Sequence, residues 1–422
     1  MSDALPLPPR PNLEQYKKLA KDFQSACESS DAGAVRVWAA SWLQKLAGLQ
    51  EIDRGARRIE QRWHKLKKVR CAVADAQFFI AREHGFASWP KFSKHVEALA
   101  AANSQVSNFE AATDAIVRGD IAALKKLLDD GPTLVHARST REHRSTLLHY
   151  VSANGIEDFR QKTPSNIVEI ANLLLTKGAD VNAESDAYGG GSTALGLVAT
   201  SVHPERAGVQ IALLETLLEH GARIDRPSAA GNGHSVIAGC LANGQPKAAE
   251  FFANLGASLD LESAAALGRL EIVQSSFDEA FKQQIESGFL YACGYGRPQV
   301  VKFLLEKGTD PAFRNINGQT GLHWAAYGAH AEVVELLLQH RSPIDTKENN
   351  FQAQPLDVAL YVWDTSPDEA QRDRCYGVVS LLAQAGAKLD PDHWRDTDDK
   401  PGILEKIRAD SRMSAALRGE SR

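Results

Sequence analysis

The sequence lacks the features that mark several large classes of protein. No apolar run approaches the roughly 18 residues that a membrane span needs, and the first residues lack the basic and apolar regions of a secretory signal. The odd number of cysteines and the absence of any C-x-x-C pair argue against a disulfide framework and a zinc site. Phosphate-binding loops and the H-E-x-x-H and G-x-S-x-G motifs are also missing. We therefore expect a cytoplasmic protein with reduced thiols, no metal, no cofactor and no membrane segment.

The composition is that of an ordered protein whose charge is spread unevenly. Of the 422 residues, 43% are hydrophobic and 24% are charged. Residues 1–100 hold 17 Lys and Arg against 11 Asp and Glu, a balance of +6. The net charge of the whole chain is −5, so the remainder carries −11. This asymmetry predicts two parts with different surfaces.

A short signature of two apolar residues, two variable residues and a glycine recurs along the chain. Its clear copies end at Gly131, Gly178, Gly221 and Gly308, and weaker copies end at Gly256 and Gly386. The apolar pair suits the buried face of a helix, and the glycine suits the left-handed turn that ends it. After Leu337 and Leu338 the equivalent residue is Arg341, where we expect a backbone strain of about 1 kcal/mol.

Residues 317–338 carry the fullest copy of a longer pattern. They read N-G-Q-T-G-L-H-W-A-A-Y-G-A-H-A-E-V-V-E-L-L-L. This resembles one ankyrin repeat, whose pattern is G-x-T-P-L-H-x-A-A-x-x-G-H-x-x-V-V-x-L-L-L. Eight degenerate copies align between about 108 and 390. The resemblance implies an all-α fold, an ankyrin-repeat solenoid of about eight repeats preceded by a small helical domain.

The expected domains are an N-terminal helical domain (1–104), the solenoid (105–390) and a C-terminal capping helix with its tail (391–422). Three repeats exceed the 33-residue period, through inserted segments at 156–166, 201–208 and 364–376. Each contains a proline, so we expect loops. The three inserted segments are either loops lengthened without effect on function or a wall beside the concave groove. An amphipathic helix at 403–417 is expected to cover the last repeat.

The N-terminal part shows helical periodicity without the repeat pattern. Asn12 is the expected cap of a first helix, and Gly85 and Ser88 are expected to end one helix and start the next. Residues 74–92 resemble the helical leader of many bacterial ankyrin-repeat proteins, which implies a bacterial origin. The basic segment 54–70 holds eight Lys and Arg against Glu60. It is either an amphipathic helix docked through Ile59, Trp63 and Val69, or a nucleic-acid contact, the less favoured reading.

The candidate binding residues come from the family pattern. In ankyrin repeats the residue after T-P-L-H points into the concave groove, and the residue three positions later lies beside it. These positions are aromatic mostly in repeats six to eight, and a carboxylate replaces the motif histidine in repeat eight. The predicted groove residues are Tyr150, Tyr291, Trp324, Tyr327, Asp357 and Tyr361. Alternatively, the rings pack against one another. The motif histidines His149 and His323 are expected to be structural.

These observations support two functional hypotheses. The first is a scaffold that binds a protein or peptide in its groove. The second is a small-molecule or glycan site, possibly an enzyme, formed by the aromatic groove and the inserted segments. No residue pair has the spacing of a catalytic acid and base, so no catalytic residue is predicted.

Overall fold

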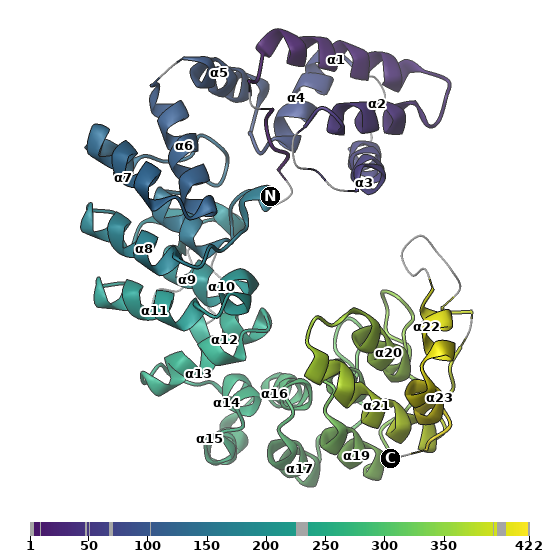
Figure 1. The fold of residues 1–422 in the computed structure, drawn as a ribbon. Helices are drawn as coiled ribbons and strands as arrows, with labels where there is room; N and C mark the ends of the chain where they lie inside the picture. Colours follow the sequence, from purple (N-terminus) through teal and green to yellow (C-terminus); the bar gives the residue numbers. More distant parts are fainter. Residues whose placement is uncertain are drawn as a thin grey trace. The chain divides into compact units, whose positions relative to one another are not determined.

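The computed structural model is predominantly helical and contains two compact units. It describes residues 4–8, 10–46, 49, 51–66, 71–101, 103–224, 235–390, 392–394 and 402–420. Unit 1 is Met1–Phe251 and unit 2 is Phe252–Arg422, and each is described by itself. In both units, helices follow one another in pairs along the chain (Figure 1). The predicted boundaries at 104/105 and 390/391 do not coincide with this division, because the N-terminal helices and the first repeats form one unit.

Unit 1 begins with five helices: α1 (Leu13–Glu28), α2 (Ala34–Leu43), α3 (Ile52–Lys65), α4 (Val73–Glu83) and α5 (Trp89–Ala100). The expected helix boundaries are confirmed. The Asn12 side chain accepts a hydrogen bond from the backbone N–H of Glu14 at 2.8 Å. Gly85 has a φ of 80°, and Ser88 precedes α5, with Pro90 in its first turn.

Aromatic side chains hold these five helices together. The ring of Phe23 lies 4.2 Å from Trp38, 4.8 Å from Trp63 and 5.3 Å from Phe79, between centroids. Ile59 and Trp63 are buried, so α3 is docked through an apolar stripe. Val69 and the other residues of 67–70 lie outside the described residues.

The remaining elements of unit 1 form helical repeats. The first helices are α6 (Gln105–Arg118), η2 (Leu147–Ser152), α9 (Ala194–Ala199) and α12 (Val236–Ala242), where η marks a 3-10 helix. The second helices are α7 (Ile121–Asp130), α8 (Ile167–Thr176) and α11 (Gln210–Glu219), and α13 (Pro246–Asn254) contains the boundary between the units. Shorter elements lie between them: η1 (Pro132–His136), η3 (Asp158–Arg160), β1 (Glu184–Ser185), η4 (Ala187–Gly189), β2 (Ser192–Thr193) and α10 (Val202–Arg206). Strands β1 and β2 pair antiparallel.

Unit 2 continues the same alternation. Its first helices are α14 (Leu261–Leu267), α16 (Lys282–Gly294), α18 (Gly321–Tyr327) and α20 (Pro355–Thr365), and each packs on the next. The second helices are α15 (Leu270–Ser276, followed by η5, Phe277–Glu279), α17 (Pro298–Glu306), α19 (Ala331–Gln339) and α21 (Glu369–Gln384). The first and second helices share one core, which includes Phe289, Leu322 and Val334.

The predicted helix-ending turns occur at all but one of the marked positions. Positive φ angles of 87–102° are found at Gly178, Gly221, Gly256, Gly308 and Gly386. Arg341 adopts the same left-handed region, with a φ of 60°, as expected. Gly131 does not, because its φ is −141°. Pro132 follows it and restricts it to an extended conformation, from which η1 starts.

Two other expectations are corrected in unit 2. The inserted segment 364–376 is mostly helical, since α20 continues to Thr365 and α21 starts at Glu369, with Pro367 in the short turn between them. The expected helix at 403–417 is two helices, α22 (Ile403–Ala409) and α23 (Ser411–Leu417). Asp410 separates them, and its side chain accepts a hydrogen bond from the backbone N–H of Met413 at 2.8 Å. Both helices bury side chains in the core that includes α21.

Candidate functional site

Two of the predicted groove residues, Tyr291 and Trp324, pack against each other on successive first helices. Their ring centroids lie 5.5 Å apart with an interplanar angle of 84°, a T-shaped contact. The indole also covers Gly294, where an added Cβ would lie 2.8 Å from Trp324 Cε3. Both rings are half-buried, and α16 and α18 fix their orientation.

Tyr327 and Tyr361 are the exposed members of the predicted set. Their side chains are 63% and 50% exposed, on α18 and α20. The backbone carbonyl of Tyr327 accepts a hydrogen bond from Gln371 Nε2 at 3.0 Å, which ties the end of α18 to the start of α21. We call Tyr291, Trp324, Tyr327 and Tyr361 the first-helix face of unit 2.

The other two predicted groove residues, Tyr150 and Asp357, are buried instead. The Tyr150 hydroxyl donates to Glu157 Oε1 at 3.2 Å, because the inserted segment 156–166 lies against it. Asp357 Oδ2 accepts from the backbone N–H of Gln354 at 2.9 Å, and its Oδ1 accepts from the indole N–H of Trp394 at 2.8 Å. The expectation that these two side chains face the groove is therefore wrong, since both are used inside the protein.

Negative charge lies near Tyr291. Burial raises the pKa of its hydroxyl, and the carboxylates of Glu262 and Asp260 raise it further. Asp260 is also the N-cap of α14, where its Oδ1 accepts from the backbone N–H of Ser263 at 2.7 Å.

Exposed apolar side chains recur in the connections between repeats of unit 2. Phe281, Ile316 and Phe351 precede α16, α18 and α20, and all three are exposed. They are separated by 35 residues each. We call them the apolar tips. Sequence reasoning missed them, although their spacing, close to the repeat length, was a readable signal.

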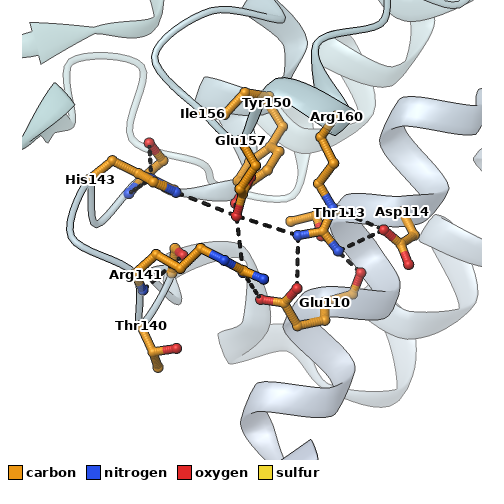
Figure 2. A network of polar contacts seen from close by, with 12 residues as sticks. Glu110, Thr113, Asp114, Thr140, Arg141, His143, Tyr150, Ile156, Glu157 and Arg160 are labelled. Carbon is orange, nitrogen blue, oxygen red and sulfur yellow. Dashed lines mark hydrogen bonds and ion pairs between the residues drawn. The ribbon is translucent and has the colours of Figure 1, made fainter. Parts of the chain in front are cut away.

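A network of buried charges lies in unit 1 and includes one predicted site residue, Tyr150 (Figure 2). Arg141 Nη1 lies 2.7 Å from Glu110 Oε1 and 2.9 Å from Glu157 Oε1. Arg160 Nη1 lies 2.7 Å from Glu110 Oε2, and its Nη2 lies 2.7 Å from Asp114 Oδ1. The four central side chains, Glu110, Arg141, Glu157 and Arg160, are almost completely buried.

The network keeps its carboxylates ionised. Burial alone would raise the pKa of Glu110, but Arg141 and Arg160 outweigh it and lower that pKa to about 2. The same two guanidinium groups hold the pKa of Glu157 well below its usual range. A buried carboxylate that stays charged and paired is a poor general acid or base near neutral pH. The arrangement is therefore suited to structure rather than to catalysis.

The segment that carries Arg141 also contacts the N-terminal helices. The backbone N–H of Glu142 donates to the carbonyl of Gly85 at 3.0 Å, and the Glu142 side chain forms an ion pair with Arg82. His95 Nδ1 lies 2.7 Å from Thr140 Oγ1. These contacts dock the N-terminal helices onto the first repeats. Sequence reasoning missed the network because positions 110, 141, 157 and 160 share no spacing pattern.

The motif histidines are structural, as predicted. His149 Nδ1 accepts from the backbone N–H of Thr146 at 3.1 Å, and its Nε2 donates to the carbonyl of Ser192 at 3.1 Å. His323 Nε2 makes the equivalent bond to Ala353 at 3.1 Å. Burial lowers the pKa of His149 to about 4, which keeps the ring neutral and able to make both bonds.

The described residues contain no group of three or more His, Cys, Asp or Glu side chains placed to hold a metal ion. Among the same residues, no helix has the length and apolar character needed to cross a membrane.

Comparisons with known proteins agree with the repeat pattern. A family model of three copies of ankyrin repeats matches residues 289–392. The human transient receptor potential cation channel subfamily A member 1 is 34% identical over 135 residues, which are 30% of this chain and 11% of that protein. Serine/threonine-protein kinase 12 of Arabidopsis thaliana is 28% identical over 133 residues, which are 30% of this chain and 26% of that protein.

The chain thus spans about a tenth and about a quarter of these two curated relatives. Among solved structures, the human ASB11 ankyrin repeat domain is 20% identical, and the match covers 66% of this chain and 99% of that domain with a TM-score of 0.28. The matched family model and the fold together show that the chain contains ankyrin repeats.

Proposed function

We propose that this chain is an interaction scaffold that binds a protein or peptide on the first-helix face of unit 2. The observation that carries the proposal is the exposure of Tyr327 and Tyr361, at 63% and 50%, on neighbouring first helices. Large exposed aromatic side chains are frequent anchors of protein interfaces. Tyr291 and Trp324 supply a rigid, half-buried continuation of the same face.

The energetics favour a partner that covers these rings. A tyrosine exposes apolar ring surface to water, and its burial stabilises a complex by about 25 cal/mol per Å². Its hydroxyl can keep a hydrogen bond at the rim of an interface. Truncating such an anchor typically costs about 2 kcal/mol or more of binding free energy. The apolar tips offer further surface of the same kind.

Affinity capture with the full chain tests the proposal. The wild-type chain, the double variant Tyr327→Ala/Tyr361→Ala and the control Tyr188→Ala would be immobilised and exposed to cell extract, with bound proteins quantified by mass spectrometry. Tyr188 is a matched control because it is 61% exposed and lies in unit 1. We expect a partner that the wild type and the control retain and the double variant loses. Equal retention by all three would refute the proposed face.

The alternative, a glycan or small-molecule site with enzymatic activity, has weaker support. Asp357 and Asp364 are the two carboxylates of α20 that such a site could use. Asp357 is buried and hydrogen-bonded, and Asp364 Oδ1 lies 2.5 Å from Lys406 Nζ. Neither is a free carboxylate that faces the aromatic rings. The docked position of α3 likewise weakens the case for nucleic-acid binding by segment 54–70.

We also infer that the protein works in the cytoplasm of a bacterium. The resemblance of residues 74–92 to a bacterial leader and the odd number of cysteines, with no C-x-x-C pair, support this inference. Fractionation of cells that express the tagged chain tests the location, and recovery outside the cytoplasm would contradict it.

A further inference from the structure

We propose that the first helices of repeats one to three form a peptide-binding face in unit 1, and that residues 154–163 occupy this face as an intramolecular ligand. We call residues 154–163 the docked segment. The partner that such a face fits is a short peptide with a carboxylate and a guanidinium group three residues apart, as in Glu157 and Arg160. The inference goes beyond the proposed function, because every residue that it uses lies in unit 1.

The docked segment covers the positions that the repeat pattern directs into the groove. Asp114, Tyr150 and Leu197 hold the same repeat position on α6, η2 and α9. Asp114 Oδ1 accepts hydrogen bonds from Arg160 Nη2 at 2.7 Å and from Arg160 Nε at 3.0 Å. The Leu197 carbonyl accepts from Asn154 Nδ2 at 3.2 Å. Tyr150 is completely buried under the segment, so this face of unit 1 is closed where the first-helix face of unit 2 exposes its tyrosines.

Two charged side chains carry the recognition. Glu157 and Arg160 reach from the docked segment into the buried network (Figure 2). Glu157 Oε1 lies 2.9 Å from Arg141 Nη1, and Arg160 Nη1 lies 2.7 Å from Glu110 Oε2. A carboxylate of the segment thus meets a guanidinium of the repeats, and a guanidinium of the segment meets a carboxylate. Reciprocal pairing of this kind fixes the register and the direction of a bound peptide.

The backbone of the docked segment is independent of the repeats. Among the described residues, its backbone–backbone hydrogen bonds all stay within the segment, such as the one from the N–H of Gln161 to the carbonyl of Asp158 at 3.1 Å. Asp158 and Lys162 are exposed on its outer side. The segment is therefore held on the repeats by its side chains, as a short bound peptide can be, so a separate peptide with the same side chains can replace it.

The fit of the docked segment is incomplete. Glu157 Oε2 and Arg141 Nε are buried, and neither has a hydrogen-bond partner among the described residues. A buried polar atom without a partner weakens the docking. The covalent connection offsets this loss, because it keeps the segment at a high effective concentration beside the face. A free peptide therefore competes poorly with the intact segment and well with a weakened one.

Peptide binding by the full chain tests the inference. A fluorescein-labelled peptide of residues 154–163 would be titrated with the wild type and with Glu157→Ala/Arg160→Ala, and fluorescence anisotropy gives the dissociation constants. The double variant removes both charges of the segment together, so Arg141 keeps Glu110 as its partner. We expect the double variant to bind the peptide at least about tenfold more tightly than the wild type, because the competing segment is weakened.

Matched controls separate recognition from unspecific binding. Asp158→Ala/Lys162→Ala makes the same kind of change on the exposed side of the segment and should leave the face closed, as in the wild type. A second peptide, with its glutamate and arginine exchanged, should bind the Glu157→Ala/Arg160→Ala chain at least about tenfold more weakly, because each charge then faces its own sign. Circular dichroism confirms that each variant is folded. If Glu157→Ala/Arg160→Ala does not fold, Arg160→Ala takes its place, with the same comparisons.

Three results would overturn the inference. Failure of a folded, weakened variant to bind the peptide would mean that the segment is a fixed part of the fold. Equal binding by the wild type would mean that the segment does not close the face. Equal binding of the exchanged peptide would mean that the two charges are not recognised. None of these results affects the proposed function, which the capture experiment tests on unit 2.

Discussion

Replacing Glu157 by glutamine should destabilise unit 1 more than any single change at its surface. Glu157 is completely buried and lies 2.9 Å from Arg141 and 3.5 Å from Arg160. Glutamine has nearly the same shape and keeps one acceptor oxygen for the Tyr150 hydroxyl. The substitution therefore removes the charge without opening a cavity, and the loss of stability measures the contribution of that charge.

The magnitude follows from what is left behind. After the change, two buried guanidinium groups face only Glu110 and Asp114, and the Asp114 side chain is 44% exposed. Removing one partner of a buried ion pair costs about 3–5 kcal/mol, because the remaining charge stays desolvated. Asp114→Asn removes the same charge from the water-exposed edge and should cost about 1 kcal/mol or less.

Hydrogen exchange measured by mass spectrometry is the appropriate assay, since it reports unit 1 apart from unit 2. Peptides that cover 138–160 should lose protection equivalent to about 3–5 kcal/mol in Glu157→Gln. Adding Arg160→Gln to Glu157→Gln should cost less than the sum of the single changes, because it removes a charge that is already poorly paired. A loss no larger than that of Asp114→Asn would refute the account of the network.

Three further predictions concern other parts of the molecule. The free energy of unfolding of unit 1 should fall as the pH drops from 6.5 towards 4. Burial lowers the pKa values of His95 and His149 from 6.5 to about 4, so only the unfolded chain takes up a proton on these residues in this window. The expected loss is about 3 kcal/mol for each histidine. Urea titrations across pH would measure the slope, and a pH-independent midpoint would contradict the prediction. Arg341→Gly should raise the melting temperature, because relieving the backbone strain stabilises the folded state by up to about 1 kcal/mol. Gly308→Ala should lower the melting temperature. A lower melting temperature for Arg341→Gly would count against the strain. Asp357→Leu should destabilise unit 2 by about 2–3 kcal/mol, because it leaves the Trp394 indole N–H and the first turn of α20 without their hydrogen-bond acceptor. The milder variant Asp357→Asn, if folded, should bind the partner as tightly as the wild type. Weaker partner binding by folded Asp357→Asn would restore Asp357 as a binding residue.

The repeat fold could be predicted because its signals are local and recur. The apolar pair and the glycine describe the end of a single helix, so each copy could be read by itself and then placed in register with the others. The left-handed turn at Arg341 was predictable for the same reason. Gly131 was mispredicted because Pro132, one residue further on, imposes a different conformation. The prediction of a loop at 364–376 was wrong because Pro367 occupies only a short turn, and the residues after it favour a helix.

The candidate site could be predicted only in part, because burial depends on distant parts of the chain. Trp324 and Tyr291 share a repeat position, so their contact follows from register. Tyr150 occupies the same position, but Glu157 in the inserted segment covers it. Asp357 accepts a hydrogen bond from Trp394, 37 residues further on, and no local pattern around either residue indicates this contact. Contacts of this kind leave no periodic trace in a single sequence.

The most direct test of the central claim is site-specific photo-crosslinking from the first-helix face. Para-benzoylphenylalanine would replace Tyr327 in one chain and Tyr188 in another, and the crosslinked partner would be identified by mass spectrometry. Both residues are similarly exposed, at 63% and 61%, but they lie in different units. The account predicts a partner adduct from position 327 and none from position 188. An adduct from position 188 alone, with the partner bound in both chains, would contradict it.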